Sequence, residues 1–123
     1  MPRVVHFDIA AADTNRAIAF YKRAFGWKIT KAHGALDYWL IRTGEKDAPG
    51  IDGGIAQREA DWQRITMFVD VESADASSAR IKKAGGRIVQ PRTAIPGVGY
   101  VVACEDTEGN VFAIIQRDET AGF

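Results

Sequence analysis

The residues Tyr100–Gln116, with the sequence YVVACEDTEGNVFAIIQ, decide the fold of this chain. Two apolar runs, Tyr100–Cys104 and Val111–Ile115, flank the polar segment Asp106–Asn110. Apolar β-formers separated by a cluster of Asp, Gly and Asn are typical of two strands joined by a turn. Gly109 can take the positive φ that such a turn often needs. The stretch therefore predicts a β-hairpin near the end of the chain.

Length, composition and charge describe one ordinary globular domain. The 123 residues are 46% hydrophobic and 26% charged, and sixteen basic side chains balance sixteen acidic ones. A net charge of zero removes the simplest argument for a nucleic-acid or membrane partner, and no apolar run approaches the ~20 residues of a membrane span. The single cysteine, Cys104, excludes an intramolecular disulfide and fits a reducing cytoplasm, where we expect the protein. We expect Cys104 to be a small core residue rather than a reactive thiol.

The first half of the chain shows one helix among four strands. Asp13 is placed to cap the helix and Gly26 to end it. The predicted elements are a strand at Val4–Ala10, a helix at Asn15–Phe25, and strands at Lys28–Ala32, Asp37–Thr43 and Gly53–Gln57.

The second half repeats this order. Ser73 lies sixty positions after Asp13, and Gly86 sixty after Gly26. The predicted elements are a strand at Arg64–Val71, a helix at Asp75–Lys83, a strand at Arg87–Gln90, a loop at Thr93–Gly99 that includes a mobile segment or lid at Pro96–Gly99, and the final hairpin. Residues 118–123 are expected to form a loose tail.

The repeat predicts the fold class. Each half has the order βαβββ, with module one at about residues 3–58 and module two at about residues 63–117. We expect an α+β fold in which the two modules pair into a curved, half-open, barrel-like sheet. The helices would cover its convex side and leave a concave cleft.

Two groups of side chains are candidates for function. His6 and Asp8 lie two residues apart on one strand face, so they form either a general base with its carboxylate or a hydrogen-bonded pair lining a wet cleft. Tyr38, Trp39 and Tyr100 are expected at corresponding places of the two halves. They either wall a pocket for an apolar or aromatic ligand, or form core or dimer contacts.

Four stretches, taken together, carry a resemblance that covers nearly the whole chain. They are His6 on the first strand, the segment from Asp13 to Gly26, Ile81–Gly86 and Asp106–Phe112. The combination resembles the vicinal oxygen chelate superfamily, the group of glyoxalases, bleomycin-resistance proteins and extradiol dioxygenases. The segment Ala94–Tyr100 further resembles a glyoxalase-related subgroup without a settled reaction. The resemblance implies that the chain pairs into a homodimer.

The resemblance also implies where a metal would bind. Metal-dependent members carry one ligand on the first and fourth strands of each module, positions that fall here on His6, Gly54, Thr66 and Ala113. Only His6 is a good ligand, whereas a catalytic metal site normally keeps about three protein ligands. We therefore expect no metal and no other cofactor. A displaced divalent metal site built from His6, Asp8 and a loop donor stays open as the alternative.

The functional expectation follows from this incomplete ligand set. We expect a protein of the bleomycin-resistance kind that binds a small molecule of unknown identity in the concave cleft, without the usual metal. The alternative is a glyoxalase-like lyase or isomerase that uses His6 and Asp8, with or without a metal; a weaker one is an interaction module that has lost its chemistry. The residues expected to contact a ligand are Tyr38, Trp39, Gly54, Thr66, Phe68, Tyr100 and Ala113.

Overall fold

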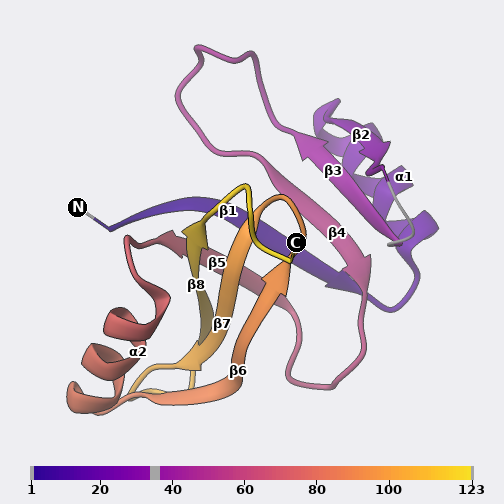
Figure 1. Cartoon of the computed structure of the whole chain (residues 1–123). Coiled ribbons are helices and arrows are strands. Elements are labelled where there is room, and N and C mark those ends of the chain that lie inside the picture. The colour runs from indigo at the N-terminus through magenta and orange to yellow at the C-terminus, as the bar shows by residue number, and fades with distance from the viewer. Residues whose placement is uncertain (1, 34–36, 123) are drawn as a thin grey trace. The chain divides into compact units, whose positions relative to one another are not determined.

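The computed structural model of the chain describes residues 2–33 and 37–122, and it divides into two compact units (Figure 1). One unit, His6–Thr66, contains most of module one, and the other begins at Met67 and includes the start of the first strand. The elements are β1 (Arg3–Ala11), α1 (Thr14–Phe25), β2 (Lys28–Lys31), β3 (Tyr38–Arg42), β4 (Gly53–Gln57), β5 (Ile65–Asp70), α2 (Ala74–Lys83), β6 (Arg87–Ile95), β7 (Gly99–Glu105) and β8 (Val111–Arg117).

Module one is a four-stranded sheet with α1 on one face. Its strand order is β2-β3-β4-β1, with β1 and β4 parallel and the other pairs antiparallel. The Asp13 side chain accepts a hydrogen bond of 3.0 Å from the Arg16 amide, which satisfies a free donor at the start of α1. Gly26 ends the helix with a φ of 70°. Both predicted helix boundaries are confirmed to within one residue.

The alternation of side chains along β1 separates the core of module one from a polar face. Ile9 and Ala11 are buried with Ile29, Ile41 and Ile55, and α1 packs Ala17, Ile18 and Tyr21 on this cluster. His6 and Asp8 point to the other side of the sheet, because alternate residues of a strand share a face. We call that side, opposite α1, the open face of module one.

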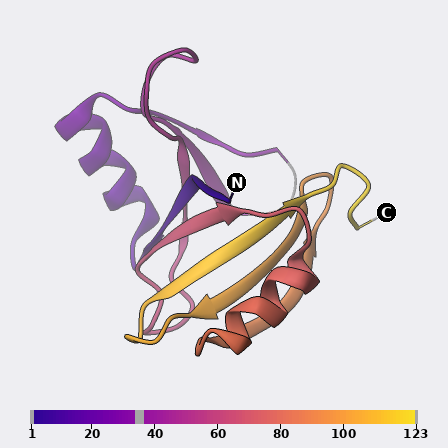
Figure 2. The same ribbon diagram turned by 90° about the vertical axis from the view of Figure 1, so that its left-hand side faces the viewer.

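Module two repeats the arrangement with the strand order β5-β8-β7-β6. Helix α2 packs along β6, β7 and β8 (Figure 2). Its Ser73 cap accepts from the Ala76 amide at 3.1 Å, as predicted. The core contains Ala74, Val102, Cys104 and Ile114. Cys104 is fully buried, which confirms the prediction of a core residue, and its burial raises the pKa of the thiol.

The predicted hairpin is present, and a hydrogen-bonded turn closes it. Strands β7 and β8 pair from Gly99–Arg117 to Glu105–Val111. In the turn, one oxygen of Asp106 accepts from the Glu108 and Asn110 amides at 2.8 and 2.9 Å, and Gly109 has a φ of 84°. The Asn110 side-chain amide donates to the other oxygen of Asp106 at 3.0 Å, and this bond, followed by the two backbone bonds, lowers the pKa of Asp106.

The prediction of a loop at Thr93–Gly99 is wrong over its first half, because β6 continues to Ile95. Thr93, Ala94 and Ile95 pair with Val101, Tyr100 and Gly99 of β7. The pairing of β6 with β7 shifts register twice between Ile88 and Thr93. These shifts accommodate Pro91, which has no backbone N–H to donate to the neighbouring strand. The connection shrinks to Pro96–Val98, where the Val98 amide bonds the Ile95 carbonyl at 2.9 Å.

The prediction of a loose tail at 118–123 is also wrong for the residues that the structure describes. The Asp118 amide donates to the Val98 carbonyl at 2.9 Å, and the Gly97 amide donates to the Ala121 carbonyl at 3.1 Å. Ala121 is fully buried. The turn after β6 therefore provides backbone partners that composition alone does not reveal.

The α+β class and the two βαβββ modules are confirmed. Among residues 2–33 and 37–122, no helix is long and apolar enough to cross a membrane.

Candidate functional site

Three polar side chains meet on the open face of module one. His6 and Asp8 come from β1 and Tyr38 from β3. The Tyr38 hydroxyl donates to Asp8 Oδ1 at 2.6 Å, and His6 Nε2 lies 2.8 Å from both Asp8 Oδ1 and Tyr38 Oη. We call these three residues the polar cluster. The structure thus brings the predicted pair His6 and Asp8 together and adds Tyr38.

The geometry of the polar cluster assigns its protons. An ionised carboxylate only accepts hydrogen bonds, and the tyrosine proton points to Asp8. His6 Nε2 must then donate to share the same oxygen. One carboxylate oxygen therefore collects two donors, which fixes the imidazole and the phenol relative to each other. The His6 and Asp8 side chains remain 29% and 30% exposed, so solvent or a ligand can reach the cluster.

The electrostatics of the polar cluster keep Tyr38 neutral. Burial raises the pKa of the phenol most, and the negative charge of Asp8 and the hydrogen bond to it raise it further. The raised pKa lies far above the usual range of tyrosine. Tyr38 is therefore a hydrogen-bond donor at any physiological pH.

A glycine makes room for this phenol. Asp8 pairs with Gly54 across the parallel strands β1 and β4, and Tyr38 crosses Gly54 to reach Asp8. A β-carbon at residue 54 would overlap the Tyr38 hydroxyl and its ring. Gly54 is one of the positions where the resemblance implies a metal ligand. The Tyr38 hydroxyl thus takes the space that a side chain at residue 54 would need.

The residues of module one do not fit a metal centre of the family type. His6, Asp8 and Asp52 offer ligand atoms near this face, but Asp8 is engaged by two hydrogen bonds, Asp52 accepts from Thr43, and Gly54 has no donor atom. Within the described part of the chain, no group of three His, Cys, Asp or Glu side chains is placed to hold a metal ion. A metal here would have to displace Tyr38 from Asp8.

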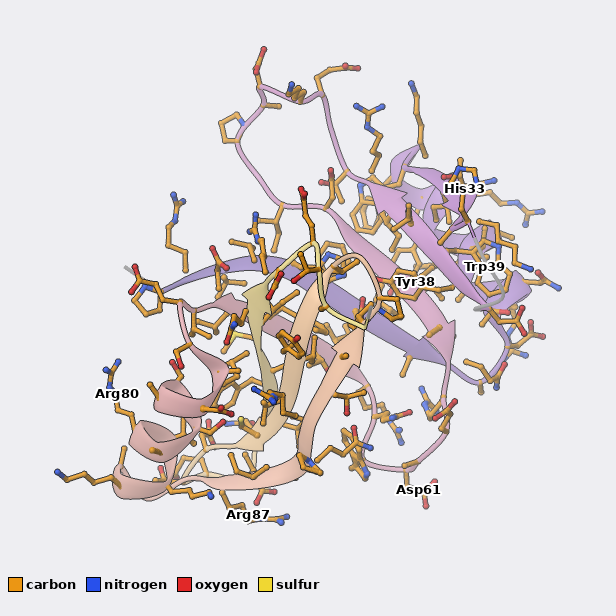
Figure 3. All side chains as sticks on the ribbon, in the orientation of Figure 1. His33, Tyr38, Trp39, Asp61, Arg80 and Arg87 are labelled. Atoms are coloured by element: carbon orange, nitrogen blue, oxygen red, sulfur yellow. The ribbon has the colours of Figure 1, made fainter. Side chains whose placement is uncertain are left out.

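Trp39 and Tyr100 lie on core faces. Tyr38 and Trp39, both labelled in Figure 3, are neighbours on β3 and so point to opposite sides of the sheet. Trp39 packs on the core of module one, and Tyr100 packs on that of module two with Arg92 stacked at 4.9 Å from its ring. The expectation that Tyr100 corresponds to Tyr38 is off by one residue in the strand register, because Leu40 opposes Gly54 while Ala103 opposes Ala113.

The other predicted ligand contacts belong to β5 and β8. Phe68 pairs with Ala113 across these parallel strands, and Ala113 is 2% exposed. Thr66 lies two residues before Phe68 and shares its face. This strand pair of module two has the Phe68 ring beside the Ala113 methyl group, whereas the equivalent strand pair of module one has Asp8 beside Gly54. The role of these three residues in ligand binding stays a prediction.

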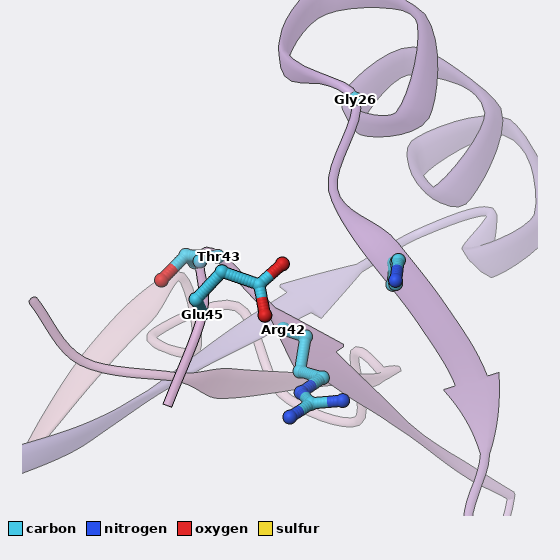
Figure 4. Close-up of a pocket in the computed structure, with 6 residues that line it drawn as sticks. Gly26, Arg42, Thr43 and Glu45 are labelled. Atoms are coloured by element: carbon cyan, nitrogen blue, oxygen red, sulfur yellow. The ribbon is translucent and has the colours of Figure 1, made fainter. Parts of the chain in front are cut away.

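A hollow of about 380 Å³ opens on the same face as the polar cluster. Its lining includes His6, Thr30, Leu40 and the two cations Lys28 and Arg42. A smaller hollow of about 120 Å³ adjoins it at Gly26, Thr43, Gly44 and Glu45 (Figure 4). Sequence reasoning missed Lys28 and Arg42. The sequence signal that could have identified them is the alternation of side chains along a strand, which puts Lys28 on the same face as Thr30 and Arg42 on the same face as Tyr38.

Comparison with known proteins agrees with this fold. The family model described as Glyoxalase/Bleomycin resistance protein/Dioxygenase superfamily matches residues 3–114. A glyoxylase-like domain-containing protein of Didymella fabae is 30% identical over 117 residues, which cover 89% of this chain and 90% of the relative. A putative glyoxylase of Mycobacterium bovis is 24% identical over 103 residues, and the match covers 81% of this chain but only 38% of that protein.

Solved structures show the same fold at low sequence identity. A hypothetical protein from Bacillus halodurans aligns with a TM-score of 0.72 and 11% identity over 99% of both chains. A variant of methylmalonyl-CoA epimerase from Streptomyces coelicolor, in complex with 2-nitronate-propionyl-CoA, aligns with a TM-score of 0.68 and 13% identity over 98% of both chains. The family model and the relative that is 30% identical lead to one conclusion: the chain belongs to the glyoxalase/bleomycin resistance protein/dioxygenase superfamily.

Proposed function

We propose that this protein binds a small organic molecule on the open face of module one, next to the polar cluster, without a metal. The observation that carries the proposal is the Tyr38 hydroxyl above Gly54, in the space of a family ligand position. A neutral phenol, an imidazole and a carboxylate are suited to orienting a ligand through directional hydrogen bonds. The hollow lined by His6 and Leu40 provides adjoining space with an apolar wall.

The experiment is a fragment screen by NMR in the presence of EDTA, with neutral and charged aromatic and aliphatic compounds. The proposal expects some fragments to shift the signals of His6 and Tyr38, and the His6→Ala and Tyr38→Phe variants to weaken those fragments. Lys22→Gln on the outside of α1 is the control and should leave binding unchanged. Fragment binding that appears only after Zn²⁺ is added, or no shift at either residue, would overturn the proposal.

A proton-transfer enzyme, a lyase or isomerase of glyoxalase-like type, is the second candidate. The contact of 2.8 Å between His6 and Asp8 favours it, because a carboxylate that orients an imidazole is a common element of general acid–base catalysis. The fold shared with methylmalonyl-CoA epimerase suggests one probe. Methylmalonyl-CoA incubated with the protein in deuterium oxide would gain deuterium at the acidic carbon if a C–H proton is removed and replaced. Loss of that exchange in His6→Ala, with binding retained, would support the enzyme, and no exchange would count against this substrate.

A further inference from the structure

Two cations oppose each other on the open face of module one. Lys28 on β2 is the direct cross-strand partner of Arg42 on β3. Directly opposed residues of antiparallel strands point to the same face with their β-carbons about 5 Å apart, and like charges there are destabilising. In the part of the chain that the structure describes, neither side chain takes part in an ion pair. The repulsion between Lys28 and Arg42 therefore lowers the stability of the fold locally, and no ion pair compensates for it among the described residues.

The neighbouring carboxylates offset these cations only in part. Asp52 lines the same hollow, but its Oδ1 accepts from the Thr43 amide at 2.9 Å and from the Thr43 hydroxyl at 3.3 Å. Those two bonds hold Asp52 at the end of β3. Glu45 lines the smaller adjoining hollow and forms no ion pair among the described residues (Figure 4). With two cations and Asp52 in its lining, the larger hollow keeps a net positive charge.

The cation pair and the polar cluster share one hollow. Lys28, Arg42 and His6 all line it, with Thr30 and Leu40 between them. Strand β3 lies two strand spacings from β1, which is roughly 10 Å between the backbones of Arg42 and His6. The long arginine and lysine side chains shorten that span. A molecule of a few bonds can therefore reach from the cations to the polar cluster.

We propose that the ligand of this site carries an oxyanion, a carboxylate or a phosphate, which Lys28 and Arg42 hold while the rest of the molecule faces the polar cluster. Arginine presents a planar fork of donors that matches both oxyanions, and lysine adds a compact positive charge. An anion between the two cations would also relieve their repulsion. This inference rests on the proposed function, because it names the chemical class of the molecule that the same face would bind.

The test compares matched fragments of equal size. Benzoate, phenyl phosphate and neutral benzamide are titrated into the wild type and into Lys28→Gln, Arg42→Gln and Lys31→Gln, with NMR shifts at Thr30 and His6 as the readout. Lys31 lies on the same strand as Lys28 but on the opposite face, so its variant is a control with the same change of charge.

We expect Arg42→Gln to weaken at least one of the two anions about tenfold and Lys28→Gln to weaken it severalfold, as loss of a charge-assisted hydrogen bond predicts. Lys31→Gln should leave the affinity within about twofold, and added salt should weaken the wild type. The two anions separate the sources, because a preference for benzoate indicates a carboxylate ligand and a preference for phenyl phosphate a phosphate ester.

Three binding results would overturn the inference, and they differ in what they mean for the proposed function. Benzamide binding at His6 as tightly as either anion would refute the anion site but leave the small-molecule site intact. Binding of no fragment of any charge would remove both. Equal weakening by Lys31→Gln and Arg42→Gln would also refute the inference, since only the net charge would then matter.

Thermal unfolding of the apo protein gives an independent readout. Removing one of two opposed cations should leave the melting temperature of Arg42→Gln equal to or above that of the wild type. A melting temperature well below that of the wild type would show that Arg42 has a structural partner and would contradict the premise.

Discussion

In module one, the parallel strands β1 and β4 pair Asp8 with Gly54, whereas the matching rung of module two pairs Phe68 with Ala113. The same backbone arrangement thus carries a carboxylate beside a glycine in one half and a ring beside a methyl group in the other. The difference extends to the neighbouring strand. Module one places Tyr38 two residues before the partner of Gly54, and module two places Val101 two residues before the partner of Ala113.

The comparison shows how a duplicated fold can specialise one half. A glycine is required at residue 54 because the Tyr38 phenol lies over it on the way from β3 to Asp8 on β1. An alanine suffices at residue 113, where no such phenol lies over the position. The polar cluster is therefore a property of module one as a unit, in which Gly54, Tyr38 and Asp8 depend on one another.

The largest expected effect comes from filling the space above Gly54. Gly54→Ala should push Tyr38 away from Asp8 and destabilise the fold by about 2–3 kcal/mol, through overpacking and a lost hydrogen bond. The reverse change in module two, Ala113→Gly, should cost only about 1 kcal/mol, the usual cost of glycine inside a strand. Urea unfolding followed by circular dichroism measures both.

The dependence between Gly54 and Tyr38 can be broken with a double variant. If overlap with the phenol is the cause, Gly54→Ala should cost much less in a Tyr38→Ala background than in the wild type. Strictly additive effects would mean that the two residues act independently and that the comparison between the modules is mistaken.

A smaller effect is expected from removing the phenol oxygen alone. Tyr38→Phe keeps the ring but takes one donor from the Asp8 carboxylate, which should cost about 1.5 kcal/mol. Tyr100→Phe is the matched control in module two, where the ring packs on the core and on Arg92, and it should change stability by less than about 0.5 kcal/mol. Equal losses in the two variants would contradict the special role of Tyr38.

The smallest effect concerns alkaline pH. The pKa of Tyr38 is raised in the folded chain, whereas in the unfolded chain it takes the ordinary value of about 10. Above that pH the unfolded chain has lost a proton that the folded chain keeps, so the free energy of unfolding falls as pH rises. Below about pH 9 both states are protonated and the contribution of Tyr38 is constant.

The control for this pH dependence is Tyr38→Phe, which shares every other titrating group. The stability difference between wild type and variant should shrink from about pH 10 upward in urea unfolding experiments. A difference that stays constant to about pH 11 would show that the pKa of Tyr38 is the same in the folded and unfolded chain.

Much of the fold follows from local sequence signals. Asp13, Ser73 and Gly26 fix the helix ends through contacts within a few residues, so their prediction is confirmed. The extension of β6 to Ile95 was not predicted, because it depends on pairing with β7 across a proline. The candidate site likewise has one part that local sequence predicts and one part that it does not. His6 and Asp8 lie on one strand and are predicted from its alternation, but the bond from Tyr38 spans thirty residues and three strands.

The most direct test of the central claim is the metal content of the protein. We would purify the untagged chain without chelator, measure bound Zn, Ni, Mn, Fe and Co by mass spectrometry, and titrate each metal against thermal stability. If Tyr38 holds the space of the family ligand, the wild type should contain no stoichiometric metal. The variant that combines Tyr38→Ala with Gly54→Glu should instead gain stability from an added metal, because a carboxylate then joins His6 and Asp8. One tightly bound metal per wild-type chain, lost in His6→Ala, would contradict the account.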